Sequence, residues 1–330
     1  MSLNCVDAAI ELVNEHNVPL ILIASRRQID SKQFNGGYVN NWTTSEFASY
    51  VMDRDIRKNI FLARDHGGPW QNNNEKKENM SLQLAMQSAK DSFKADIDAG
   101  FKILHIDPSI DIHGTPSKND LLKRLFELYE YCWSYAQSKG KNIIFEVGTE
   151  EQSGSTNTQE ELDYTLTSIE QFCNQKKIPL PTFVVIQSGT KVMETRNIGS
   201  FDSPLRVFDE IPSEIQVPKM IEICKKHNIF MKEHNTDYLS DTALSWHPRL
   251  GIHAANVAPE FGVAETKALL QIMEHNGFVS LANKFLELSY NSKKWDKWML
   301  PNTKASDRDR SVIAGHYIFS TPECQELKSE

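Results

Sequence analysis

The chain has 330 residues, of which 40% are hydrophobic, so it is long enough to bury a large core. It carries 36 basic and 44 acidic side chains, a net charge of -8, and no Lys/Arg-rich tract, which argues against a nucleic-acid surface. An anionic ligand would therefore need a local basic pocket or backbone amides. The five scattered cysteines favour reduced thiols, and no apolar run reaches the roughly 18 residues of a membrane span. We expect a cytoplasmic globular protein with neither membrane nor nucleic-acid partners.

Short apolar runs rich in β-branched residues recur along the chain, about one every 40 residues. Continuous apolar runs bounded by turn residues are typical of parallel strands that are buried on both faces. The sequence predicts seven such strands, at residues 19–25, 59–66, 102–109, 142–148, 182–189, 229–234 and 251–257.

Segments of helical period separate these runs. Helices are predicted at 79–99, 119–139, 158–177, 217–227 and 262–275, the first two ending at Gly100 and Gly140 as natural C-caps. The alternation predicts a (β/α)8 barrel, the TIM-barrel architecture, as a single domain over 1–330 with an accessory helical tail at about 276–330. The eighth strand would either be irregular or lie at 31–39 or near 311–320. An open doubly wound sheet is the alternative, disfavoured because no GxGxxG turn follows the first strand.

Polar residues gather where the predicted strands end. Active sites of such barrels are built on the carboxyl ends of the strands, and polar groups there must be paired, hydrated or metal-bound. These residues are Asp65 and His66, His105 and Asp107, Glu146, Gln187 to Thr190, His234 and Asp237, and His253 and Asn256. Six strand ends converging on one rim favour a functional site over a hydrogen-bonded core.

The residue types suggest a metal site with an adjacent base. His66, His234 and Glu146 could supply nitrogen and oxygen ligands to a divalent ion, with Asp65 beside them as general base. For His105 and His253, a hydrogen-bonded buried imidazole is the equal alternative.

Two segments could bind an anion. The first is Gln187, Ser188, Gly189, Thr190 and Lys191, where backbone amides and a lysine coincide. The second is Arg26, Arg27 and Gln28 just after the first strand, with a solvated surface pair as the alternative. The Gly-Gly pairs at 36–37 and 67–68 also allow close approach of an anion, or are plain turns. His105, Asp107, Asp237 and His253 complete the predicted substrate-binding set.

Several motifs resemble a known family. Residues 59–68 (NIFLARDHGG) resemble the strand of class II, metal-dependent ketose-bisphosphate aldolases that ends in Asp-His-Gly. Residues 96–109 (DIDAGFKILHIDPS) and 145–154 (FEVGTEEQSG) are similar to two further segments of that family.

A sister group is closer still. The non-catalytic subunit of tagatose-bisphosphate aldolase, a family also named tagatose-6-phosphate kinase, has motifs similar to residues 35–38 (NGGY), Asp65-His66 followed by Pro69-Trp70-Gln71, and 233–238 (EHNTDY). Its pattern continues through a strand like 251–262 (GIHAANVAPEFG), so the resemblance spans roughly residues 19 to 275.

The resemblance implies roles for single residues. Asp65 would be the catalytic acid/base, His66 and His234 ligands of a divalent metal such as zinc, Glu146 an auxiliary ligand, and Asn256 a catalytic contact to substrate. The chain departs from the aldolase pattern in two places. It has Gln187-Ser188-Gly189-Thr190 where a ligand histidine stands in a His-Gly pair, and His234-Asn235-Thr236-Asp237 in place of His-Gly-Gly-Ser-Gly. The third ligand, which could come from His105, His253 or Asp237, and the phosphate loop are left open.

Three functions follow as hypotheses. The first is metal-assisted aldol cleavage or formation of a ketose phosphate, with sugar epimerisation as a related chemistry. The second is a non-catalytic subunit that supports a partner aldolase chain, and self-association into a homo-oligomer is a further expectation. A sugar kinase is disfavoured because no phosphate-cradling glycine loop is found.

Overall fold

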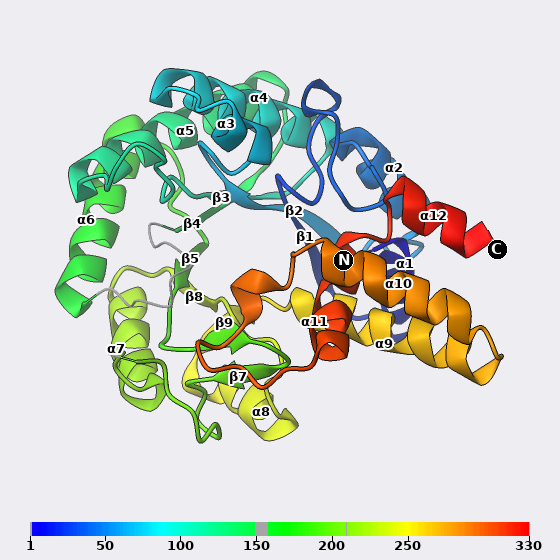
Figure 1. Cartoon of the computed structure of the whole chain (residues 1–330). Helices are drawn as coiled ribbons and strands as arrows, with labels where there is room; N and C mark the ends of the chain where they lie inside the picture. Colours follow the sequence, from blue (N-terminus) through cyan, green and yellow to red (C-terminus); the bar gives the residue numbers. More distant parts are fainter. Residues whose placement is uncertain (1, 149–157, 209, 330) are drawn as a thin grey trace.

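The computed structural model describes residues 2–148, 158–208 and 210–329. Its centre is a sheet of seven parallel strands in the order β1-β2-β3-β4-β5-β8-β9 (Figure 1). All seven predicted strands are confirmed. They are β1 (Leu20–Ser25), β2 (Ile60–Gly67), β3 (Ile103–Ile106), β4 (Ile144–Val147), β5 (Phe183–Ile186), β8 (Phe230–Glu233) and β9 (Ile252–Ala255). A two-stranded antiparallel hairpin, β6 (Lys191–Met193) and β7 (Arg196–Ile198), follows β5.

Helices surround the sheet on its outer side (Figure 1). They are α1 (Leu3–His16), α2 (Thr44–Arg54), α3 (Asn73–Lys77), α4 (Leu82–Ala99), α5 (Lys118–Ser138), α6 (Gln159–Lys176), α7 (Ser213–Lys226), α8 (Asp241–Leu250), α9 (Pro259–His275), α10 (Val279–Asn291), α11 (Asp307–Ala314) and α12 (Pro322–Ser329). Short 3₁₀ helices lie at η1 (Lys32–Phe34), η2 (Asp296–Trp298) and η3 (Gly315–Tyr317). No helix in the described parts of the chain is long and apolar enough to cross a membrane.

Local signals account for the helix boundaries. Gly100 ends α4 in the left-handed conformation at φ 94°, as predicted. Helix α2 was missed, although Thr43 and Glu46 form a complete capping box at its start. Its buried residues Thr44, Phe47, Ala48 and Val51 have the i, i+3, i+4, i+7 spacing of a helix, so the signal was present in the sequence.

The expected eighth strand is wrong at both proposed places. Residues 31–39 contain η1, and residues 311–320 contain the end of α11 and η3. Among the described residues no hydrogen-bonded pairing joins β9 to β1. In the corresponding part of Figure 1, α9 lies beside α1, and the Asn4 amide donates to Glu265 of α9 at 2.8 Å. The fold is therefore an α/β fold with a curved seven-stranded parallel sheet.

Two hydrophobic cores stabilise the chain. The larger packs the sheet against α1, α2 and α4 to α7, and contains Phe47, Phe93, Leu104 and Phe145. The smaller joins α9 to the C-terminal helices around Phe285, which is fully buried. The predicted helical tail thus has a core of its own, which it shares with α9.

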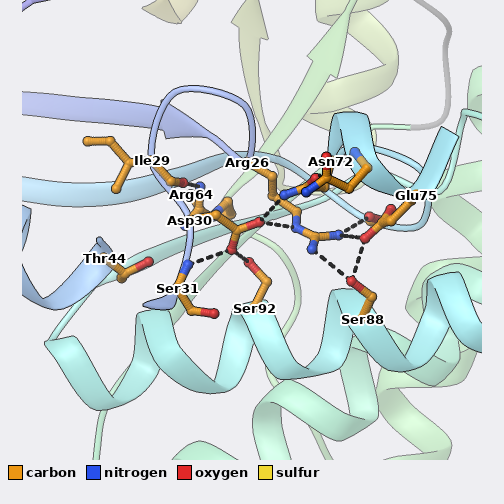
Figure 2. Close-up of polar contacts among 12 residues, drawn as sticks. Arg26, Ile29, Asp30, Ser31, Thr44, Arg64, Asn72, Glu75, Ser88 and Ser92 are labelled. Carbon is orange, nitrogen blue, oxygen red and sulfur yellow. Dashed lines mark hydrogen bonds and ion pairs between the residues drawn. The ribbon is translucent and has the colours of Figure 1, made fainter. Parts of the chain in front are cut away.

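Buried arginines connect the first two strands to α4, as Figure 2 shows. Arg26 follows β1, and its guanidinium donates to Asp30 at 3.0 Å, Glu75 at 2.5 Å and Ser88 at 2.9 Å. On β2, Arg64 forms a bidentate pair with Asp96 of α4 at 2.6 and 2.8 Å. Charges buried this deeply must be paired. The network holds the loop after β1 against β2 and α4, so the predicted role of Arg26 as an anion clamp does not fit its position.

Candidate functional site

The side chains of the candidate site come from the inner face of the sheet. Successive residues of a strand point to opposite faces, so His105 on β3 and Glu146 on β4, which are register partners, share one face. Lys232 of β8 lies on that face, and so does His234, which comes two residues later, just after the strand. Glu233 between them points away and pairs with His247 of α8 at 2.7 Å. The carboxyl ends of parallel strands therefore bring residues far apart in sequence to one place.

A bulge at the end of β2 adds two consecutive residues. The register between β2 and β3 shifts between Arg64 and Gly67, and His66 has a φ of 44°. An extra residue in a strand breaks the alternation of side chains and is often found next to active sites. As a result both Asp65 and His66 reach the same cluster, which strict alternation would forbid.

Three imidazole rings meet there. The ring centroids of His66 and His105, and of His66 and His234, are 5.1 Å apart, and those of His105 and His234 are 5.7 Å apart. Carboxylates of Asp65 and Glu146 lie between them, and Nδ1 of His105 is 3.6 Å from Asp65 and 3.5 Å from Glu146. Ligand atoms of Asp65, His105, Glu146 and His234 all lie within 4.8 Å of one another, and we call these four residues the central cluster.

His66 is oriented by a second carboxylate. Its Nδ1 lies 2.6 Å from Oδ2 of Asp107, and the same oxygen accepts from Gln71 at 2.9 Å. Burial alone would lower the pKa of His66, but Asp65 and then Asp107 raise it above the ordinary value. Asp107 and Gln71 thus fix the ring of His66 with its Nε2 directed toward Asp65, 3.6 Å away. Carboxylates orient metal-binding histidines through the second ring nitrogen in this way.

Lys232 is a site residue that the sequence analysis missed. It is 3% exposed, and its ammonium donates to both oxygens of Glu146 at 2.7 and 2.8 Å. Burial would raise the pKa of Glu146, but Lys232, His105 and His234 lower it to about 2. The available signal was a lysine inside an apolar strand, two residues before His234 and hence on the same face.

Asp65 is the member of the central cluster that reaches solvent. Its side chain is 12% exposed, against 1 to 3% for His105, Glu146 and His234. Burial would raise the pKa of Asp65, but His66, His105 and His234 hold it well below its usual range. Its Oδ1 is buried without a hydrogen-bond partner among the described residues. Asp65 is therefore the carboxylate of the cluster that reaches solvent, while its Oδ1 faces inward, 3.6 Å from Nδ1 of His105.

Two predicted residues near β9, Asn256 and Asp237, contact His234 and the start of α9 respectively. The amide of Asn256 lies 2.9 Å from Nε2 of His234. Asp237 accepts the backbone N–H groups of Ala258 and Glu260 at 2.9 and 2.8 Å, and so caps α9. Burial, opposed by those two bonds, raises the pKa of Asp237 to about 6. Asp237 accordingly has a structural task and contributes no ligand to the cluster.

The other predicted residues lie outside the cluster. His253 is exposed and stacks on Phe230 with ring centroids 4.3 Å apart. Ser188 donates to Glu233, Gln187 accepts from Asn235 at 3.0 Å, and Gly189 and Thr190 lead into the β6–β7 hairpin that begins at Lys191. Gln28 accepts from the backbone of Ser25 at 2.8 Å. The predicted phosphate loop and His253 are thus not assembled with Asp65. The motif at 145–154 lies outside the described residues from 149 onward.

The sequence matches a known family. Residues 3–304 match the family described as D-tagatose-1,6-bisphosphate aldolase subunit GatZ/KbaZ-like. The chain belongs to this GatZ/KbaZ-like family. The resemblance inferred from the motifs is thereby confirmed, and sugar-phosphate metabolism of the aldolase type is the context it provides.

Solved structures share the fold of this GatZ/KbaZ-like chain. A probable tagatose 6 phosphate kinase from Sinorhizobium meliloti 1021 superimposes with a TM-score of 0.76 at 18% identity, covering 98% of this chain and 83% of that one. The fructuronate-tagaturonate epimerase UxaE from Cohnella laeviribosi has a TM-score of 0.50 at 11% identity, covering 97% and 77%. At these identities the likeness establishes the fold alone.

Gly68, in the Asp-His-Gly-Gly segment of this GatZ/KbaZ-like chain, gives a first testable prediction. A Cβ at Gly68 would lie 1.9 Å from the carbonyl oxygen of Asp107, so Gly68→Ala must push the ends of β2 and β3 apart. We expect a loss of about 1–3 kcal/mol in the free energy of unfolding, measured by urea denaturation. Gly114→Ala is the matched control, because no atom lies within 4 Å of its added Cβ. Equal stability of the two variants would contradict the close approach of the strand ends.

Proposed function

We propose that the chain carries out metal-assisted aldol cleavage or formation of a ketose phosphate, with Asp65 as the acid/base. The observation that carries the proposal is the central cluster, whose carboxylate and imidazole atoms converge at the carboxyl ends of the strands with Asp65 at the accessible side. Family membership supports the class of substrate, because the family description names a D-tagatose-1,6-bisphosphate aldolase subunit.

The residues fit a divalent ion such as zinc. Imidazole nitrogens with carboxylate oxygens are a typical zinc donor set, with bonds of about 2.0–2.2 Å. Two donors on opposite sides of a tetrahedral angle would then stand about 3.5 Å apart. Separations of 3.5 Å between His105 and Glu146 and of 3.9 Å between His234 and Glu146 are of this size. The unpartnered Oδ1 of Asp65 also fits a cation nearby.

His105, His234 and Glu146 would hold the ion. His66 would not be a ligand, and its Nε2 would face Asp65 at 3.6 Å. Glu146 can take part only by turning one oxygen away from Lys232, which now binds both. Such an ion supplies polarisation of a substrate carbonyl when bound. This set differs from the predicted trio of His66, His234 and Glu146 in that His105 takes the place of His66.

The protein's own residues would move the proton. Asp65 is ionised throughout the neutral range, because its pKa is held well below the usual value after His66 and its neighbours overcome burial. It can therefore accept the proton of a substrate hydroxyl or of a carbon next to the carbonyl. Asn256 would hold His234 in place, since its amide contacts the ring nitrogen. Asp107 and Gln71 keep His66 from rotating.

Metal content provides the direct test. Purified protein dialysed against excess zinc should retain about one equivalent of zinc, measured by mass spectrometry of the metal. His234→Ala should weaken zinc binding by roughly 100-fold or more, because losing a ligand costs at least as much affinity as losing the residue that orients it. The control is His275→Ala, which removes an exposed histidine of α9 whose Nδ1 lies 2.9 Å from the backbone carbonyl of Gln271. A folded wild-type protein that binds no divalent metal would rule out the metal-assisted reaction.

A supporting subunit is the second candidate, because the family description speaks of an aldolase subunit. In that case the chain alone would not release triose phosphate from D-tagatose 1,6-bisphosphate, and turnover would require an added aldolase chain. Epimerisation of a sugar would use the same base. It would give an isomeric sugar and incorporate solvent deuterium without any triose product, so product analysis separates the three.

A further inference from the structure

Arg27 differs from its neighbour Arg26. Arg26 is buried and fully engaged, whereas Arg27 is half-buried, and its guanidinium has no hydrogen bond or ion pair within the described part of the chain. Its charge acts on His66 and also on Tyr38, Tyr317 and Lys297. The backbone carbonyl of Arg27 accepts from the N–H of Tyr38 at 3.2 Å, and the ring of Tyr38 lies 5.3 Å from that of Tyr317, so Arg27 stands next to the C-terminal segment.

Lys297 approaches from that C-terminal segment. It belongs to η2, and its ammonium lies 4.3 Å from the ring of Trp298 and 5.6 Å from the ring of Tyr317. Lys297 is an exposed residue, and its ammonium pairs with no acid among residues 2–148, 158–208 and 210–329. Desolvation by the surrounding side chains, followed by the charges of Arg27 and Lys294, lowers the pKa of Lys297 to about 8.

The backbone fixes η2 at this end of the sheet. The carbonyl of Trp298 accepts from the backbone N–H of Glu194, in the β6–β7 turn, at 2.6 Å. Thr303 donates to the side chain of Glu194, which also pairs with Arg196. In Figure 1 the orange segment containing η2 accordingly lies inside the ring of helices, close to the hairpin. Glu194 is thus already used and is not a counter-ion for Lys297.

The pair formed by Tyr38 and Tyr317 lies next to both cations, because Tyr38 bonds the backbone of Arg27 and the ring of Tyr317 is 5.6 Å from the ammonium of Lys297. The rings of Tyr38 and Tyr317 are 5.3 Å apart, edge to face. Nε1 of Trp298 and the hydroxyl of Tyr238 are buried and have no hydrogen-bond partner among the described residues. Tyr238 follows Asp237, whose carboxylate is occupied by the start of α9. Trp298, which adjoins Lys297, and Tyr238, which interacts electrostatically with Tyr317, therefore offer two unused donors near the two cations.

We propose that Arg27 and Lys297 form a binding site for the phosphate group of the substrate, completed by the N–H of Trp298 and the hydroxyl of Tyr238. Two like charges held near each other repel, and a doubly charged anion between them removes that repulsion and satisfies the donors. In a chain of net charge -8 such a pair is a local exception, as binding an anion requires. The identification of the anion as a sugar phosphate rests on the proposed function.

In this proposal the C-terminal segment takes part in substrate binding. Lys297 and Trp298 come from residues beyond α10, whereas Arg27 comes from the loop after β1. The substrate would be held between both ends of the chain, with its carbon skeleton extending toward Asp65. The predicted phosphate loop at 187–191 would then have no part in binding, in agreement with its contacts away from Asp65.

Titration with inorganic phosphate tests the site on the full chain. Calorimetry should show one phosphate per chain, with affinity at least tenfold weaker in Lys297→Met and in Arg27→Gln and retained in Lys297→Arg. Lys293→Met is the matched control, because Lys293 also lies over aromatic rings, at 4.4 Å from Tyr290 and 5.1 Å from Trp295. It should change the affinity by less than twofold.

The outcomes separate this inference from the proposed function. Absence of phosphate binding to the wild-type protein, or an unchanged affinity in Lys297→Met, overturns the anion site even if sugar phosphates are turned over. Phosphate binding that depends on Lys297 in a protein without aldol activity sustains the anion site and overturns the catalytic proposal. Zinc retention should be the same in Lys297→Met as in wild type, which shows that the two sites are independent.

Discussion

Asp65→Asn is expected to lower the rate of aldol cleavage by about 10²–10⁴-fold while leaving zinc binding largely intact. The amide keeps the size of the side chain but cannot accept a proton. Asp65 is the accessible carboxylate of the central cluster, so its loss should reduce kcat much more than it raises KM. The measurement is steady-state release of triose phosphate from a ketose bisphosphate.

Asp53→Asn provides the control, because Asp53 is an exposed residue of α2. Its kcat should equal that of the wild-type protein. Should Asp65→Asn retain full activity, the acid/base assignment would be wrong, whatever the metal content. Should it lose zinc as well, Asp65 would be a ligand, and the proton would have to be moved by another group.

The second large effect is on stability. Arg26→Leu should reduce the free energy of unfolding by about 3–5 kcal/mol, because it leaves the carboxylates of Asp30 and Glu75 buried without their cation. Both acids are at most 2% exposed, and Ser88, Ser92 and Asn72 can offer them only neutral donors (Figure 2). Urea denaturation at neutral pH measures the difference.

An exposed arginine supplies the comparison. Arg308 pairs with Glu274 at 2.8 Å, with side chains 50% and 40% exposed, so Arg308→Leu should cost at most about 1 kcal/mol. Adding Asp30→Asn and Glu75→Gln to Arg26→Leu should restore part of the loss, since the buried charges are then removed as well. A small effect of Arg26→Leu alone would show that the buried pairs are not what holds the loop after β1.

The strands were predictable because they are continuous apolar runs between turn residues, which is the signature of burial on both faces. Leu20–Ser25 and Ile103–Ile106 show it clearly. The eighth strand was predicted wrongly, because residues 31–39 contain η1 and residues 311–320 contain the end of α11 and η3. In the second segment Ile318 and Phe319 belong to the smaller hydrophobic core together with Val263 of α9.

The candidate site was predictable only in part. Asp65, His66, Glu146 and His234 stand at strand ends, so their common rim followed from the alternation of strands and helices. Arg26 and Arg27 could not be told apart, because adjacent residues after a strand point in opposite directions and only packing shows which is buried. Lys297 was beyond reach, since nothing in the sequence relates residue 297 to residue 27.

The sequence by itself determined the parallel strands, the family and the Asp65-His66 position, because hydrophobic period and short motifs are local properties of the chain. The tertiary structure decided the rest. The bulge at β2 turned Asp65 and His66 to one side, and the register of β3 with β4 set His105 against Glu146. The packing of α4 paired Arg26, while the hydrogen bond between Glu194 and Trp298 placed η2, and with it Lys297, beside the β6–β7 hairpin. Those outcomes depend on contacts between residues distant in sequence, which no local pattern encodes.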